Sequence, residues 1–186
     1  MRIMLAPGDV LLIAGSKGAL ATGIIRSGMD LTEPHKQWTH AALYVGNGDI
    51  AEATLLDGLR GEVVWRPLDV YASRPAILHG RMPHLSQEAV RAILGAAAAM
   101  KGAPYSVGRA ITLAVQTFAR RRTPPPTTPA GWQQGLICSD FVVAAYTNAK
   151  LVLIEDSDDL RTVSPATLAR STALRWQQVV PSQLVP

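Results

Sequence analysis

The segment "THAALYVGNGDIAEATL" constrains the fold more strongly than any other part of this chain. Residues 40–45 form an apolar run typical of a strand, and residues 50–55 form a second such run. The "NGD" between them is a turn sequence that joins neighbouring antiparallel strands. We therefore expect a β-hairpin whose two strands lie side by side.

The remaining elements are predicted from apolar runs, turn residues and capping residues. Four more strands are expected at residues 9–14, 61–68, 75–81 and 174–180. Helices are expected from the N-cap Ser86 to the C-cap Gly102, over residues 106–119, from Cys138 to about residue 150, and after the N-cap Ser164, with Pro165 in the first helical position. A helical turn and a loop are expected over residues 17–29. Most strands precede most helices, which predicts an α+β fold.

The length of the chain suits a single domain. It has 186 residues, of which 48% are hydrophobic, enough for one sizeable core over residues 1–186. The segment "RRRTPPPTTPAGWQQG", residues 120–135, interrupts the periodic pattern, because three consecutive prolines exclude a helix. We expect this segment to form a long surface loop or lid.

Charge and hydropathy limit the partners and the cellular compartment that we expect. The net charge of +4 permits contact with an anionic membrane surface, for which residues 20–29, "LATGIIRSGM", are a weak candidate. No basic stripe is interleaved with aromatic residues, so no nucleic-acid partner is expected. The first residues do not resemble a signal peptide, and no apolar run reaches the roughly 18 residues of a membrane span. A cytoplasmic location is the default expectation, and signal-less export remains open.

Cys138 is the only cysteine and stands where a helix is expected to begin, in "GLICSDFVVAAY". The first turn of a helix carries partial positive charge and free backbone N–H groups, which favour a thiolate and can hold an oxyanion. This position suits a nucleophile. A buried structural thiol is the alternative, because free cysteines are among the most buried residues.

A nucleophilic cysteine needs a base, and the base needs an orienting group. His40 stands at the start of the first hairpin strand, where an aliphatic side chain would be usual. Glu52 is an acid within the apolar second strand and can lie near His40 on the adjoining strand. A structural histidine and a solvent-facing glutamate are the alternative interpretations of these two residues.

The other histidines and the cysteine count argue against a metal site. His35, His79 and His84 are expected at the surface, and a lone cysteine supplies no cysteine pair. The separation of His35 and His40 does not match the i, i+4 spacing of a helical zinc motif. We expect neither a metal nor another cofactor.

The order of several short motifs resembles the circularly permuted papain-like superfamily. These motifs are "PGDVLLIAG", "WTHAALYVGNG", "AEA", "KGAPYS" and "CSDFVVAAY", followed by "SPATLA". The similar families are the NlpC-type cell-wall peptidases and, more closely, the YiiX-like hydrolases and the lecithin:retinol acyltransferase-like enzymes. In ordinary NlpC-type proteins the cysteine helix precedes the histidine strand, whereas here the histidine strand comes first.

The resemblance implies a fold and a role for each motif residue. The implied fold is an antiparallel sheet packed against a cysteine-bearing helix. Cys138 would be the nucleophile, His40 the general base and Glu52 the residue that orients the imidazole. Tyr105 would line the substrate cleft beside the thiol, and an ordinary core or helix-start aromatic is the alternative interpretation of this residue. Two aspartates have expected structural roles: Asp9 in a turn or cap, and Asp140 at the helix N-terminus.

The residues and the resemblance together indicate a cysteine hydrolase acting on an amide or ester carbonyl. Small molecules and peptidoglycan peptides are the implied substrates, and export as a cell-wall toxin would match the latter. A thiol acyltransferase or a lipid-acyl hydrolase using membrane-derived substrates is the first alternative. A non-catalytic binding module that retains the fold is the second, and a structural protein with Cys138 in its core is the third.

Overall fold

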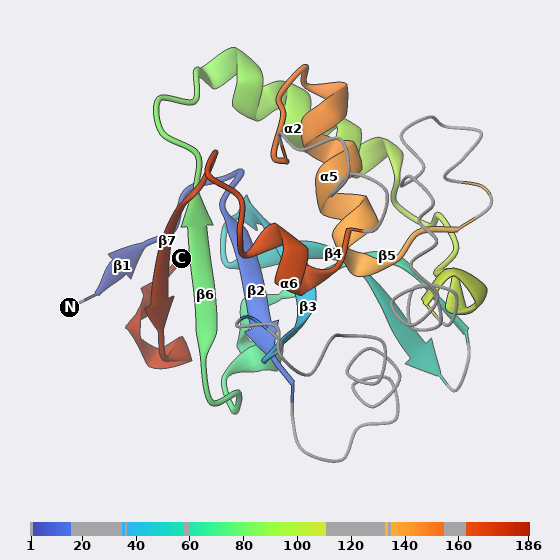
Figure 1. Cartoon of the computed structure of the whole chain (residues 1–186), viewed down its shortest axis with the longest axis horizontal. Coiled ribbons are helices and arrows are strands. Elements are labelled where there is room, and N and C mark those ends of the chain that lie inside the picture. The colour runs from blue at the N-terminus through green and yellow to red at the C-terminus, as the bar shows by residue number, and fades with distance from the viewer. Residues whose placement is uncertain are drawn as a thin grey trace.

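A computed structural model describes residues 2–15, 35, 37–57, 60–110, 133, 135–154 and 163–186. The fold is α+β, with an antiparallel sheet covered by helices on one face (Figure 1). Three of the expected segments, residues 17–29, the helix beyond residue 110 and most of the proline-rich segment, lie outside the described residues. Among the described helices, none is long and apolar enough to span a bilayer.

The described strands form a six-stranded antiparallel sheet in the order β5-β4-β3-β2-β6-β7. The bounds in chain order are β2 Val10–Ala14, β3 Trp38–Gly46, β4 Asp49–Asp57, β5 Arg60–Pro67, β6 Ile77–Arg81 and β7 Arg175–Val179. A separate pair of short parallel strands joins β1 Ile3–Met4 to β8 Leu184–Val185. The described helices are α2 Gln87–Ala99, α5 Cys138–Asn148 and α6 Pro165–Leu168, with the 3₁₀ turns η1 Leu68–Tyr71 and η3 Pro181–Gln183.

The expected hairpin is confirmed as β3 and β4. Asn47 and Gly48 connect the strands, and both have positive φ, 55° and 82°, as a tight two-residue turn of type I′ requires. Leu43 pairs with Ala51 across the hairpin. Continuing this register by one residue places Glu52 opposite Ala42.

Alternation along the strands divides the core into two faces. Ala41 and Leu43 of β3 pack on the face that α5 and α6 cover, and α2 packs against α5 (Figure 1). Ala42 and Tyr44 point to the opposite face, which η1 and the β1–β8 pair cover. Both faces of β3 are therefore buried, which explains its nearly continuous apolar sequence.

Helix starts were predicted better than helix ends. Ser86 caps α2 by accepting a hydrogen bond from Ala89 N at 3.1 Å, and Ser164 caps α6 in the same way, with Pro165 next. The prediction that Gly102 is the C-cap of the first helix was wrong, because α2 ends at Ala99 with Met100 as its cap. Gly102, with φ of 80°, lies in the turn that follows.

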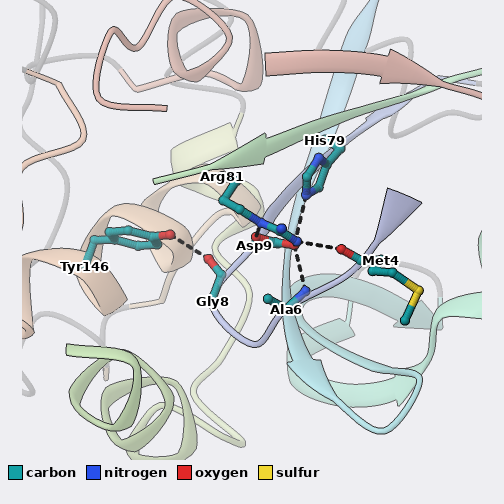
Figure 2. A network of polar contacts seen from close by, with 7 residues as sticks. All are labelled: Met4, Ala6, Gly8, Asp9, His79, Arg81 and Tyr146. Carbon is teal, nitrogen blue, oxygen red and sulfur yellow. Dashed lines mark hydrogen bonds and ion pairs between the residues drawn. The ribbon is translucent and has the colours of Figure 1, made fainter. Parts of the chain in front are cut away.

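A buried ionic network ties β2 to β6 and to the N-terminal segment (Figure 2). Asp9 accepts hydrogen bonds from Ala6 N at 2.8 Å and from Arg81 Nε at 2.8 Å, and His79 Nε2 lies 2.9 Å from its carboxylate. Arg81 also donates to the Met4 carbonyl at 2.6 Å. The expected turn role of Asp9 is confirmed. The expectation that His79 lies at the surface was wrong, because it is buried against Asp9.

Gly80 is predicted to be required for the contact between β6 and β7. A Cβ at this position would lie 2.4 Å from the Trp176 ring, so Gly80→Ala should lower the free energy of unfolding by about 1–3 kcal/mol. Gly95→Ala is the control, because no atom lies within 4 Å of its Cβ position on α2. Removing a helical glycine there should stabilise the protein by about 0.5–1 kcal/mol in urea denaturation. Equal effects of the two substitutions would contradict this packing.

Asp9 is predicted to contribute stability that acid removes. Burial raises its pKa, but hydrogen bonds from Arg81 and His79 outweigh burial and lower it below the ordinary value of 3.8. Its contribution is therefore complete above about pH 3.8 and is lost as pH falls through the lower folded-state pKa. Asp9→Asn should cost about 1–3 kcal/mol at pH 7 in urea denaturation, whereas exposed Asp69→Asn should change stability little. A variant as stable as the wild type at neutral pH would refute this role.

Candidate active site

Cys138 is the first residue of α5 and is 1% exposed. Ile137 precedes it in an extended conformation, so the chain enters the helix directly at the thiol. Ser139 Oγ donates to the Val163 carbonyl at 2.8 Å, which anchors the start of α5 to the segment before α6. The thiol therefore sits in the first turn of a fixed helix, where backbone N–H groups lack intrahelical partners.

Asp140 neutralises and orders the same helix start. Its carboxylate accepts a hydrogen bond from Arg109 Nε at 2.5 Å and a longer one from Ile137 N at 3.4 Å. Burial raises the pKa of Asp140, and the Arg109 guanidinium opposes this rise only in part. The predicted position of Asp140 at the helix N-terminus is confirmed, and the structure adds Arg109 as its partner.

The pairing of β2 with β3 changes register beside His40. Ile13 of β2 pairs with His40, whereas the next residue, Ala14, pairs with Trp38, so the ladder skips Thr39. Such a bulge bends the strand and redirects the side chains beside it. The side chain of His40 is 18% exposed.

His40 contacts both other members of the predicted triad. Its Nε2 lies 2.7 Å from Glu52 Oε2, and its ring is also hydrogen-bonded to Cys138. Because Nε2 is engaged by the carboxylate, Nδ1 is the ring nitrogen that remains for the thiol. The structure thus brings together Cys138, His40 and Glu52 from three separate elements.

The contacts of His40 with Glu52 and Cys138 together raise its pKa. Burial lowers it, but the negative charges and hydrogen bonds of Glu52 and Cys138 raise it from 6.5 to about 10. The imidazolium form is therefore stabilised between a carboxylate and the sulfur of Cys138. Such an arrangement favours transfer of the thiol proton to His40.

Glu52 is fully buried and is held by residues that the sequence did not indicate. Its side chain is 0% exposed, which excludes a solvent-facing position. Tyr71 OH donates to Glu52 Oε2 at 2.5 Å, and Arg66 Nη2 forms an ion pair with Oε1. Burial raises the pKa of Glu52, but the His40 charge and these partners lower it overall. The need of a buried acid for partners was the only available signal for Tyr71 and Arg66.

Tyr105 lies near the thiol, as the resemblance implied. Its backbone N donates to the Gly61 carbonyl at 2.7 Å, and the residue bridges to Leu136, two residues before Cys138. Burial and the negative charges of Cys138 and Asp140 raise the pKa of its phenol. Tyr105 is half-buried beside the helix start, and its contact with a substrate remains a prediction.

The described ranges contain no group of three or more histidine, cysteine, aspartate or glutamate side chains arranged to hold a metal ion. Their titratable clusters are instead organised as ion pairs around Glu52, Asp9 and Asp140. The site is therefore best described as a cysteine, a histidine and a glutamate joined by hydrogen bonds.

Comparison with known proteins does not assign a family. No model of a known protein family matches the chain, and no curated protein matches it significantly.

Glu52→Gln is predicted to lower the pKa of His40 from about 10 toward its ordinary value of 6.5, because the carboxylate charge is lost. The shift can be followed by NMR titration of the imidazole. Since the folded pKa is raised, the wild type should lose stability as pH rises from about 6.5 through about 10, and the variant should lose less. Glu62→Gln on β5 is the control, and identical His40 titrations in both variants would refute the coupling.

Proposed function

We propose that this protein is a cysteine hydrolase that cleaves an amide or ester through a Cys138–His40–Glu52 triad. The observation that carries the proposal is His40, which is bonded to buried Glu52 at Nε2 and to the thiol of Cys138 at the start of α5. A structural cysteine would require neither a neighbouring imidazole nor a buried carboxylate behind it. A binding module would have no use for this proton-transfer arrangement.

The geometry supports a two-step reaction. The thiol proton moves to His40 Nδ1, and the thiolate attacks the carbonyl carbon to give a tetrahedral oxyanion. Free N–H groups in the first turn of α5 are placed to stabilise that oxyanion. The intermediate collapses to a thioester as Nδ1–H protonates the leaving amine or alcohol.

The second step restores the enzyme. Water attacks the thioester carbonyl while His40 accepts one of its protons, and the thiolate leaves with release of the carboxylic acid. Glu52 holds the ring orientation and stabilises the imidazolium throughout. No further cofactor is needed to balance these steps.

The fold is in keeping with the proposed superfamily. A cysteine at the start of a helix packed on an antiparallel sheet, with the histidine strand earlier in the chain, is the arrangement that the permuted papain-like resemblance implies. On this basis we propose peptide or small-molecule amides as substrates, with peptidoglycan stem peptides the first class to screen. The acceptor of the acyl group distinguishes hydrolysis from acyl transfer: water gives a free acid, whereas an amine or alcohol gives an acylated product.

Alkylation of Cys138 by iodoacetamide tests the proposal. The wild type should react rapidly well below about pH 8, where an ordinary thiol is mostly protonated, because His40 holds the thiol proton. His40→Ala should react at least about tenfold more slowly at pH 6.5, since the imidazolium is lost. The rates can be measured by intact-protein mass spectrometry.

His84→Asn is the matched control, because His84 is exposed and has a φ of 58° that asparagine tolerates. It should react like the wild type. A thiol that stays inert until the protein unfolds would make Cys138 a core residue and overturn the proposed function.

A further inference from the structure

Glu52 is shared by more partners than a triad requires. One carboxylate oxygen, Oε2, receives both His40 Nε2 at 2.7 Å and Tyr71 OH at 2.5 Å. The other oxygen, Oε1, faces the guanidinium of Arg66 in an ion pair. The buried carboxylate therefore stands between two positively charged side chains, one from β3 and one from β5.

Arg66 contacts both the Glu52 carboxylate and the hydroxyl group of Tyr71. Its Nη2 also donates to Tyr71 OH at 3.1 Å, and its guanidinium carbon lies 5.6 Å from the centre of the Tyr71 ring. Tyr71 in turn lies beside the imidazole, with 6.0 Å between the ring centres of His40 and Tyr71. One guanidinium thus fixes both the oxygen and the hydroxyl group that define where Glu52 sits.

The charge of Arg66 has a direct consequence for the imidazole. A buried carboxylate with no second cation would raise the pKa of His40 further, and the imidazolium would then be a weaker acid toward the leaving group. Arg66 balances part of the Glu52 charge, and its own positive charge favours the thiolate and disfavours the imidazolium. Each effect moves the corresponding protonation step to lower pH.

We propose that Arg66, bridged to Glu52 by Tyr71, is a positioning residue that sets the pH range in which the Cys138–His40 pair works. This inference rests on the proposed function. Among the described residues, the charged or titratable groups on the imidazole side of the pair are Glu52 on β4, Arg66 on β5, Tyr71 in η1, and Arg74, whose guanidinium carbon is 5.8 Å from the Tyr71 ring centre. On the thiol side they are Tyr105 and the ion pair of Asp140 with Arg109. Of the two arginines beside Tyr71, Arg66 is the one ion-paired with Glu52.

The test compares Arg66→Met and Arg66→Gln, which remove the charge, with Arg66→Lys, which keeps it. The acid limb of Cys138 alkylation should move to higher pH by about one unit in both uncharged variants and stay near the wild-type value in the lysine variant. The NMR titration of His40 should move in the same direction by a similar amount. The glutamine variant retains an amide donor, so it covers the case in which the methionine variant does not fold.

The two readouts separate this inference from the proposed function. A wild-type thiol without rapid alkylation would overturn the hydrolase, but the His40 titration, repeated in a Cys138→Ala background, still reports the effect of Arg66. An unchanged His40 midpoint in the folded uncharged variants would overturn the role of Arg66. Equal shifts in the lysine and glutamine variants would overturn it as well, because loss of geometry rather than charge would then be responsible.

Discussion

The site depends on the antiparallel pairing of β3 with β4, which the Asn47-Gly48 turn holds in one register. That register places Glu52 opposite Ala42, so His40 and Glu52 are diagonal neighbours on one face of the hairpin. A slip of one residue would turn Glu52 toward the helix side, where Ala51 and Ala53 pack. The short glycine turn is thus as necessary for the ion pair as the two charged residues are.

Burial makes the pairing of His40 with Glu52 energetically important. Glu52 has no exposed surface, and an unpaired carboxylate there would be costly, so each of its contacts stabilises the charged form. The same confinement leaves the imidazole one nitrogen for the carboxylate and one for the sulfur of Cys138. Stability and reactivity therefore rest on the same few side chains, and a substitution at Glu52 should affect both.

Local patterns predicted the elements, but long-range contacts decided the details. The hairpin, the caps Ser86 and Ser164 and the nearness of Glu52 to His40 follow from turn chemistry and alternation within short segments. The contacts of Tyr71 and Arg66 with Glu52 do not follow from local patterns, because η1 reaches Glu52 only after β5 folds back beside β4. His79 was misjudged for a similar reason: its partner Asp9 lies 70 residues away in sequence, immediately before the neighbouring strand β2.

The sheet order has a consequence for the folding of the growing chain. Strands β2 to β6 and α5 include His40, Glu52 and Cys138, yet β6 gains its outer neighbour β7 only from residues 175–179. During synthesis β6 therefore remains an edge strand with unpaired backbone groups until β7 is made, long after the hairpin can form. Open edges favour pairing with other chains, so β7 protects β6 from intermolecular pairing and aggregation.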